Sequence, residues 1–395
     1  MTTVLFLTSH LPFPPYSGGR RREYELLCRL GKVYDIEVYA VTRTLAEDLK
    51  YVEVVRSFVK GVSLFPARSV VSMDRGLGHI SPLAHRNASR SAAGAIARRI
   101  EQGGVDLLHC EGYYMHSVVG KFDVPIFTME QNIEYLVWPE AAERIRTEEI
   151  HAWRSSTSCG AVTDEDAMVI RQAINRRNIR VSFDGCDHST LLCVKESLRP
   201  EIPPKGPLVL CPGNFAYRPS YEAGLEVCSG IGPEILRRYP EAVIMLVGND
   251  SERLLPFVSH PKITLLGRVS SLESFYAAAT VVICPLRLGR GIKVKVLEAL
   301  VRGCALVTTT VGVQGLRDAP VVVSDSPDQF VAEVVRLLLD RDARNKLKRR
   351  AAAYGAALPT WNAAAERLHE CWEEAIRLGE QQGLSRLRGA VGGAE

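Results

Sequence analysis

Positively charged side chains and glycines are concentrated between residues 285 and 295. Apolar residues at helical spacing, Val294, Leu297 and Val301, predict a helix from about Ile292 to Val301. A glycine loop before a helix brings backbone N–H groups close to an anion, and the start of the helix adds partial positive charge. The chemistry that fits this arrangement is the binding of a diphosphate. The cations are Arg287, Arg290, Lys293 and Lys295, and the glycines are Gly289 and Gly291.

The elements around this stretch are expected to place it at the edge of a parallel sheet. One apolar run ends at Cys284, and another follows the turn at Gly303. Glu298 lies three residues after Lys295 on the predicted helix. The two side chains could form a surface pair, worth only a few tenths of a kcal/mol. The alternative is that Glu298 accepts hydrogen bonds from a ligand.

The residues from Pro285 to Ala299 read P-L-R-x-G-x-G-x-x-x-K-x-L-E-A. This stretch resembles the nucleotide-sugar site of GT-B glycosyltransferases, specifically the retaining enzymes of glycosyltransferase family 4. The family often carries two glutamates separated by seven residues. Glu298 matches the second of them, whereas Arg290 stands at the first position. The resemblance implies that Glu298 binds the ribose hydroxyls of the nucleotide and that Arg290 lies on the sugar side.

The same resemblance implies roles for further residues in the second half of the chain. Relatives place basic residues on the diphosphate near Arg218, which directly precedes Pro219. The expected catalytic set, which stabilises the leaving diphosphate, is therefore Lys295, Arg218 and Arg287. The segment Gly312–Leu316 matches the family's G-x-x-G-L. The nucleotide is expected to contact Gly213, Asn214, Gly248, Val269, Gly291 and Ile292, besides Glu298.

The first half resembles the family more loosely. Gly18 and Gly19 follow a predicted strand at Val4–Thr8 and predict a loop before a helix that starts near Arg20. In the family this loop faces the donor phosphates and the acceptor. The run from Glu130 to Tyr135 resembles the family's E-H-N-I-E-Y segment, with Gln131 at the His position. A Gln can hydrogen-bond a hydroxyl but cannot take a proton. Gly19 is thus expected at the nucleotide, and Gly18, Glu130 and Gln131 at the sugar and acceptor.

Apolar strands alternate with helices along a chain of 395 residues, which is typical of two doubly wound α/β domains. The resemblance implies a GT-B fold, with two Rossmann-like domains that face a central cleft. We expect a first domain on the acceptor side and a second that binds the nucleotide sugar. The predicted boundaries are 1–187 and 207–358 for the domains, 188–206 for the linker, 359–380 for a helix that crosses back to the first domain, and 381–395 for a flexible tail.

Composition excludes several other classes of protein. The net charge of +4 is too small to indicate binding to nucleic acid. The ten cysteines include no C-x-x-C pair, which favours reduced thiols in a cytoplasmic protein. The first apolar run, Val4–Leu7, is too short for a signal peptide, and no run approaches the roughly 20 apolar residues of a membrane span. Contact with a membrane is therefore expected to be peripheral at most, at the inner face.

The sequence thus predicts a retaining glycosyltransferase of the hexosyltransferase type. It would move a sugar from a nucleotide diphosphate sugar to a hydroxyl of a polysaccharide, a lipid-linked glycan or a secondary metabolite. In the front-face mechanism proposed for such enzymes, the departing phosphate accepts the acceptor's proton, so no protein nucleophile is required. Lys and Arg supply the positive charge, so neither a metal nor another cofactor is expected. Two alternatives stay open: a nucleotide-sugar epimerase with the same fold, and a non-catalytic partner with a degenerate donor site.

Overall fold

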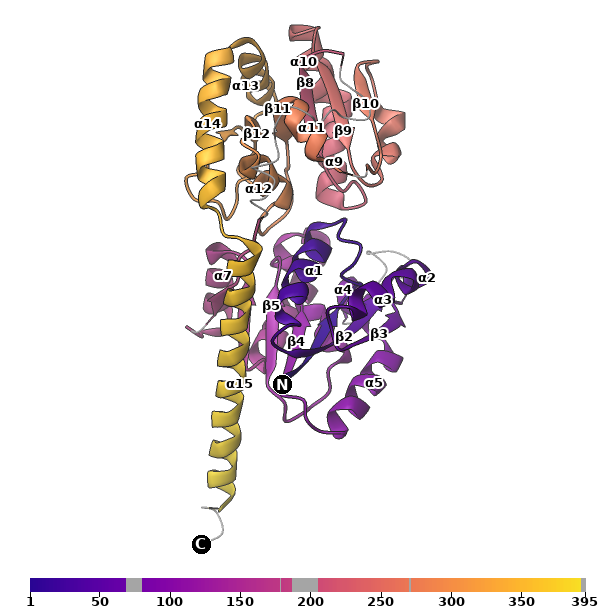
Figure 1. The fold of residues 1–395 in the computed structure, drawn as a ribbon, viewed down its shortest axis with the longest axis vertical. Helices are drawn as coiled ribbons and strands as arrows, with labels where there is room; N and C mark the ends of the chain where they lie inside the picture. The colour runs from indigo at the N-terminus through magenta and orange to yellow at the C-terminus, as the bar shows by residue number, and fades with distance from the viewer. Residues whose placement is uncertain (69–79, 178, 187–204, 270, 392–395) are drawn as a thin grey trace. The chain divides into compact units, whose positions relative to one another are not determined.

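The structure is a computed structural model that forms two compact units (Figure 1). Unit 1 comprises Met1–Asp184 and Trp361–Glu395, and unit 2 comprises Gly185–Thr360. Residues 188–204 of the predicted linker lie outside the described residues. The described residues are 1–68, 80–177, 179–186, 205–269 and 271–391, with side chains through residue 383.

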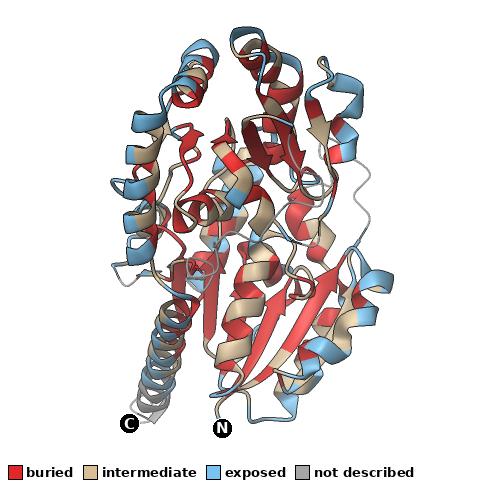
Figure 2. Cartoon of the chain, turned by 45° about the horizontal axis from the view of Figure 1, so that its top comes forward, coloured by how far each residue is buried: buried red, intermediate tan, exposed pale blue. Residues whose placement is uncertain are grey.

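Unit 1 is built on a parallel sheet with the strand order β3-β2-β1-β4-β5-β6-β7. Its central strands are buried along their whole length (Figure 2). Strands with helices over both faces are apolar without alternation, as the sequence predicts for β1. The strands are β1 Thr3–Thr8, β2 Asp35–Thr42, β3 Gly61–Pro66, β4 Leu107–Glu111, β5 Ile126–Glu130, β6 Ser158–Ala161 and β7 Arg180–Val181.

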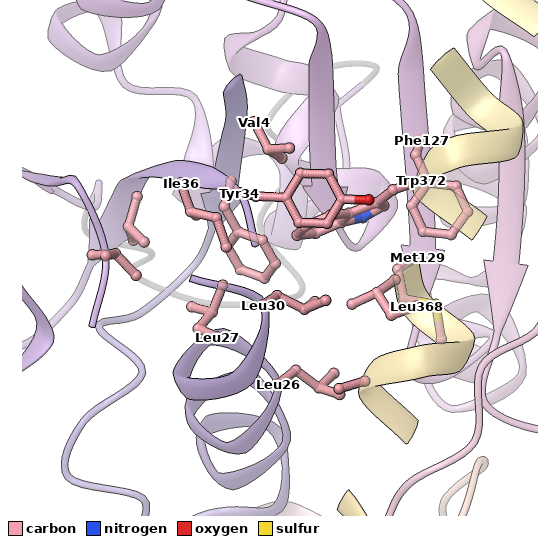
Figure 3. Close-up of a cluster of buried hydrophobic side chains, with 14 of the residues drawn as sticks. Val4, Leu26, Leu27, Leu30, Tyr34, Ile36, Phe127, Met129, Leu368 and Trp372 are labelled. Atoms are coloured by element: carbon pink, nitrogen blue, oxygen red, sulfur yellow. The ribbon is translucent and has the colours of Figure 1, made fainter. Parts of the chain in front are cut away.

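The helices of unit 1 include the last helix of the chain, α15. Its Leu368 and Trp372 pack against Leu26 of α1 and Phe127 of β5 in one buried cluster (Figure 3). The helices are α1 Gly18–Leu30, α2 Leu45–Asp48, α3 Val52–Arg56, α4 Pro82–Asn87, α5 Arg90–Glu101, α6 Ala142–Ser155, α7 Asp164–Ile174 and α15 Trp361–Val391, with short 3-10 turns η1 Leu49–Tyr51, η2 Tyr113–Val118, η3 Glu134–Leu136 and η4 Pro139–Ala141.

The end of α15 differs from the prediction. The helix continues to Val391, where the sequence predicts a flexible tail from residue 381. Most residues between Gln381 and Arg388 are good helix formers, and the single glycine among them, Gly383, does not interrupt the helix. Over the described residues, no helix combines the length and the apolar composition that crossing a membrane requires.

Unit 2 is built on a second parallel sheet, with the strand order β10-β9-β8-β11-β12-β13. Helices α12, α13 and α14 follow the strands that form one half of this sheet. The strands are β8 Leu208–Pro212, β9 Val243–Val247, β10 Ile263–Leu265, β11 Ala279–Cys284, β12 Leu306–Thr308 and β13 Val322–Val323. The helices are α9 Arg218–Glu226, α10 Gly232–Arg238, α11 Glu273–Ala278, α12 Val294–Val301, α13 Pro327–Leu339 and α14 Arg341–Ala357, with a π-helical turn η5 Val227–Ile231 and a 3-10 turn η6 Ser251–Phe257.

Candidate functional site

The strand order of unit 2 contains a point at which the chain reverses its direction across the sheet. From β8 the chain moves outward through β9 to β10, and it then returns to place β11 on the other side of β8. Ligands of open parallel sheets bind at the carboxyl ends of the strands on either side of such a switch point. In unit 2, these ends lead into Gly213 after β8 and into the 285–295 stretch after β11.

The loops after β8 and β9 approach each other so closely that a side chain does not fit between them. Gly248 has a φ of +139°, and a Cβ at this position would lie 1.8 Å from the carbonyl oxygen of Gly213. The Gly213 N–H donates to the Val247 carbonyl at 3.0 Å, and the Gly248 N–H donates to the Gly267 carbonyl at 2.8 Å. These contacts bring the carboxyl ends of β8, β9 and β10 close together. Position 248 therefore requires glycine for a steric reason.

Asn214 closes the turn that follows β8. Its Oδ1 accepts hydrogen bonds from the Ala216 N–H at 3.2 Å and from Asn249 Nδ2 at 3.3 Å. The Phe215 N–H donates to the Asn249 carbonyl at 2.8 Å. Asn214 thus links the loops after β8 and β9, and its side chain fixes the conformation of the loop next to Gly213.

The ammonium group of Lys295 lies at this edge of the sheet. Lys295 belongs to the first turn of α12, and its Nζ donates to Ser220 Oγ, in the first turn of α9, at 2.8 Å. The same Nζ lies 3.4 Å from the position of a Cβ built on Gly213. The positive charge is therefore held where the β8 loop meets the first turns of two helices. The first N–H groups of a helix have no partner within it and favour negative charge, so this is a position suited to a phosphate.

Lys293 shapes the loop that precedes α12. Its Nζ donates to the carbonyls of Gly291 at 2.6 Å and Arg290 at 3.0 Å. Its own carbonyl accepts from the N–H groups of Val296 and Leu297 in α12. Gly289 and Gly291 have φ angles of +116° and +68°, which favour glycine. The loop is thus held in shape by a cation that bonds to its carbonyl groups, with Arg290 half-buried within it.

The other two predicted phosphate ligands are paired with glutamates. Arg287 donates to both carboxylate oxygens of Glu226, at 2.7 and 3.1 Å, and also to the carbonyl of Asp325. The hydrogen bonds to Glu226 raise the pKa of Arg287. Arg218 donates to Glu222 at 2.8 Å, one turn further along α9. Arg287 therefore joins the loop after β11 to α9, whereas Arg218 forms a pair within α9 itself.

Glu298 lies one turn beyond Lys295 on α12, and a buried tyrosine fixes the orientation of its carboxylate. Its Oε2 accepts a hydrogen bond from the hydroxyl of Tyr276 at 3.2 Å. The ring of Tyr276 is buried and lies 4.7 Å from the guanidinium of Arg302, which also forms an ion pair with Glu273. A carboxylate supported in this way has a defined orientation.

The two apolar residues predicted at the nucleotide pack on the core of the same half of unit 2. Val269 and Ile292 both contact the buried cluster that includes Leu297 and Leu316. Their packing joins the loop after β10 and the loop before α12 to one apolar layer. The structure therefore brings together the predicted residues that come from four separate loops of unit 2.

In unit 1, the predicted loop at Gly18 and Gly19 is wrong, because both residues belong to the first turn of α1. The helix starts there because the side chain of Ser17 accepts a hydrogen bond from the Arg20 N–H. A Cβ on Gly19 would lie 2.9 Å from Oε1 of Gln131, so the two predicted residues are neighbours in the structure. A larger residue at position 19 would press against Gln131, so packing favours glycine there.

Gln131 is held by a line of buried polar residues. Its Nε2 donates to Glu111 at 2.8 Å, and the other oxygen of Glu111 lies 2.7 Å from His109 Nε2. The remaining ring nitrogen of His109, Nδ1, accepts a hydrogen bond from the indole N–H of Trp372 at 2.9 Å. This line joins α15 to the carboxyl ends of β4 and β5 and sets the orientation of the Gln131 amide.

Glu130 has a structural partner within unit 1. Its Oε1 accepts from the Trp153 indole N–H at 2.8 Å, and burial raises the pKa of the carboxyl well above its usual value. Several other carboxylates lie nearby. Even so, in the part of the chain that the structure describes, no group of three or more His, Cys, Asp or Glu side chains could hold a metal ion.

The sequence interpretation missed four polar residues that the structure places at the switch points, namely Ser220, Glu111, His10 and Glu23. Glu23 carried a signal: it lies three and four residues before Leu26 and Leu27, on the apolar face of α1, and a carboxylate on such a face requires a partner. The partner is His10, which no local pattern connects to it. Ser220 is separated from Lys295 by 75 residues, so sequence spacing does not indicate their contact.

Comparison with known protein families finds a match within unit 2. Residues 206–340 match the family described as Glycosyl transferases group 1. The matched segment begins just before β8 and ends at the last residue before α14, so it contains both sides of the switch point. No curated protein sequence matches the chain.

Solved structures similar to this chain extend over both units. The Anabaena protein Alr3699/HepE, in complex with UDP and glucose, shares 13% identity with a TM-score of 0.66, covering 94% of this chain and 99% of that one. A glycosyltransferase from Rickettsia africae shares 14% identity with a TM-score of 0.64, covering 95% and 98%. A putative UDP-N-acetylglucosamine 2-epimerase from Listeria monocytogenes shares 13% identity with a TM-score of 0.59, covering 93% and 94%. The predicted fold class is confirmed: two Rossmann-like units with parallel sheets, as in the GT-B glycosyltransferases.

Proposed function

We propose that this protein is a glycosyltransferase that moves a sugar from a nucleotide diphosphate sugar to a hydroxyl acceptor. The observation that carries the proposal is the position of the Lys295 ammonium, beside Gly213 at the switch point of unit 2. The family match over residues 206–340 supports it, because that segment contains the same loops. The structural neighbour in complex with UDP and glucose is consistent with a nucleotide-sugar donor.

In this proposal, Lys295 and the first turn of α12 bind the diphosphate. Negative charge develops on the diphosphate as its bond to the anomeric carbon breaks, and a cation held in place beforehand stabilises that transition state. Glu298, oriented by Tyr276, accepts hydrogen bonds from the ribose hydroxyls. Arg218 and Arg287 are the further cations proposed for the diphosphate; Arg287 joins its loop to Glu226 of α9, and Arg218 is paired with Glu222 on the same helix. Because these side chains supply the charge, the proposal includes no metal.

The finer description rests on the resemblance of the Pro285–Ala299 stretch. It comprises membership of glycosyltransferase family 4, transfer of a hexose and retention of the anomeric configuration. In this description unit 1 binds the acceptor, near Gly18, Glu130 and Gln131, and Arg290 lies at the transferred sugar. A product with inverted configuration would contradict the assignment to a retaining family.

Nucleotide binding is the first test. Purified protein is titrated with UDP, GDP, ADP and dTDP, and the thermal midpoint of unfolding is measured. One diphosphate is expected to stabilise the protein, because a ligand that binds the folded state alone raises its stability. Lys295→Ala should lose most of this stabilisation. Lys346→Ala, which changes an exposed lysine of α14, should retain it. Equal responses of the two variants, or none in the wild type, would overturn the proposal.

The epimerase alternative is tested with the donor alone. The GT-B fold is shared by the putative 2-epimerase from Listeria monocytogenes, so the fold does not separate the two reactions. A transferase should release the nucleoside diphosphate more rapidly when a hydroxyl acceptor is added. Formation of an epimeric sugar nucleotide without any acceptor would favour the epimerase. Tight binding without either reaction would favour a non-catalytic partner.

A further inference from the structure

Arg43, Arg68 and Arg86 form an arginine cluster in unit 1, where the carboxyl ends of β2 and β3 meet α4 (Figure 1). Arg43 directly follows Thr42, the last residue of β2. The Ala67 N–H donates to the Thr42 carbonyl at 2.8 Å, and the Arg68 N–H donates to the Arg86 carbonyl at 2.9 Å. These two backbone hydrogen bonds bring the ends of both strands to α4, and the three arginines with them.

The positive charges of the arginine cluster are not offset in the way that neighbouring charges are. Lys50 and Arg56, on the turns that follow β2, each form an ion pair with the glutamate three residues earlier in the chain. In the part of the chain that the structure describes, Arg43, Arg68 and Arg86 form no ion pair. Arg43 and Arg68 are exposed, and Arg86 is half-buried.

The guanidinium of Arg86 experiences the charge of Arg43. Burial lowers the pKa of Arg86, and the like charge of Arg43 acts in the same direction, whereas Tyr114, Glu134 and Tyr113 raise it. Two like charges that face each other where water is partly excluded are stabilised when an anion binds near both. The arrangement therefore favours a negatively charged ligand.

The acidic side chains of this edge have other partners. The carboxylate of Glu134 accepts a hydrogen bond from the indole N–H of Trp138 at 2.9 Å, and burial raises its pKa, which reduces the negative charge that it offers to Arg86. Glu23 and Glu111, beside the switch point between β1 and β4, each have a histidine partner. An anion at the arginine cluster would thus meet positive charge that the protein itself does not offset.

A phosphoryl group suits the arginine cluster better than a carboxylate does. It presents three oxygens and carries about two negative charges at neutral pH, so several guanidinium groups can bind it at once. A carboxylate presents two oxygens, which a single guanidinium can already bind. Ligands of open parallel sheets bind at the carboxyl ends of the strands, which is where the arginine cluster lies.

We propose that Arg43 and Arg86, with Arg68 beside them, bind the phosphoryl group of a phosphorylated ligand. The inference rests on the proposed function in one respect, because that function makes this ligand the acceptor. The acceptor is then a phosphorylated sugar or a phosphorylated lipid, and its phosphoryl group serves for binding only. No bond to that group forms or breaks.

Binding tests the proposal without any turnover. Inorganic phosphate and glucose 6-phosphate are titrated calorimetrically, with glucose as the uncharged comparison, in the presence of the nucleoside diphosphate that the thermal test selects. Vesicles of phosphatidylcholine, with and without phosphatidic acid, test the lipid source by sedimentation. The wild type should bind one of the phosphorylated probes and neither glucose nor phosphatidylcholine alone.

Variants of the arginine cluster locate the site. Arg86→Gln should raise the dissociation constant of the phosphorylated probe by about tenfold, as expected for the loss of a hydrogen bond between charged groups. The double variant R43Q/R68Q, which changes only exposed side chains, should also raise it by about tenfold and keeps the test valid if Arg86→Gln does not fold. Arg98→Gln, at an exposed position of α5, removes the same charge and should match the wild type.

Failure of this inference is distinguishable from failure of the proposed function. All of these variants should keep the thermal shift caused by the nucleoside diphosphate, because that ligand is proposed to bind unit 2. Wild-type affinity for the phosphorylated probe in the double variant, or no binding of any phosphorylated probe by the wild type, would overturn the inference. Loss of phosphate binding in Lys295→Ala but not in the double variant would also overturn it, because the anion would then bind unit 2. A wild type that bound the phosphorylated probe but no nucleotide would retain the anion site and overturn the donor site.

Discussion

The switch points of the two units have the same topology but different side chains. In unit 2, the strand ends carry Gly213 and Gly248, and a lysine ammonium lies beside them. In unit 1, Glu111 ends β4 and Glu23 of α1 contacts Thr8 at the end of β1, and both carboxylates are buried next to histidines. Each site lies between the first strand of its sheet and the strand to which the chain returns.

The difference shows that topology selects the place of a site, whereas side chains select its ligand. Close loops and a fixed cation favour a diphosphate at unit 2. Buried carboxylates disfavour an anion, but they orient donors and acceptors for a neutral hydroxyl group. Substitutions in both units test this contrast.

Gly248→Ala is expected to cause the largest change. The added Cβ would lie 1.8 Å from the Gly213 carbonyl, at a φ of +139°. We expect the free energy of unfolding to fall by about 3 kcal/mol through strain and overpacking, together with loss of nucleotide binding. Gly103→Ala in unit 1 is the matched control, with a φ of +78° but no atom within 4 Å of its Cβ, so the strain alone costs about 1 kcal/mol. Equal losses in chemical denaturation would show that the close approach is unimportant.

Lys295→Ala removes the ammonium group that lies beside Gly213 at the switch point of unit 2. Its kcat/KM for the sugar nucleotide should fall by about 100-fold, the scale of losing one group that stabilises developing charge. Steady-state kinetics across donor concentrations measures the change. Lys346→Ala should keep the wild-type value. A fall of less than about threefold, within ordinary variation between surface variants, would remove Lys295 from the reaction.

Glu298→Ala sharpens the contrast, because it removes a carboxylate that is proposed to bind hydroxyls within the cationic site. The dissociation constant of the nucleoside diphosphate should rise by about tenfold, as expected for a hydrogen bond to a charged group. Calorimetric titration measures the affinity, with Glu241→Ala as a control at an exposed position of unit 2. An unchanged affinity would contradict the ribose role.

Glu149→Gln tests whether a buried carboxyl group of unit 1 is protonated in the folded protein, through the pH dependence of stability. Burial raises the pKa of Glu149 from 4.5 to about 9, so the folded state retains this proton at neutral pH. The stability linked to the proton is fully present below pH 4.5 and is lost as the pH rises through about 9. The glutamine variant does not titrate. Between pH 6 and pH 10, the wild type should therefore lose more than about 1 kcal/mol relative to the variant, since one pKa unit corresponds to about 1.4 kcal/mol.

Urea denaturation of both proteins at the two pH values measures this difference. The Gln amide oxygen can still accept the Glu134 N–H, which donates to Glu149 at 2.6 Å in the wild type, but its NH2 group cannot accept the Tyr135 N–H, which lies 3.4 Å from the other oxygen. That loss does not depend on pH, so the change between the two pH values reports the charge. A difference in stability that does not vary with pH would show that Glu149 is not held protonated in the folded protein.

Local patterns predicted the elements that present the donor site. The apolar run before Pro285 is β11, and the helix that the spacing of Val294, Leu297 and Val301 predicts is α12. Such patterns succeed where each residue's burial follows from its own segment. The loop at Gly18 failed because the Ser17 cap, and not the glycine pair, determines where α1 begins.

The sequence by itself determined the order of strands, glycine loops and helices, and the place of Lys295 and Glu298 on one helix. Tertiary structure alone decided that Lys295 lies against Ser220 and Gly213, and that His10 lies against Glu23. The physical reason is that these contacts depend on which strands become neighbours in the sheets. Strand pairing is a long-range outcome of burying both faces of each sheet, so the spacing of residues along the chain does not record it.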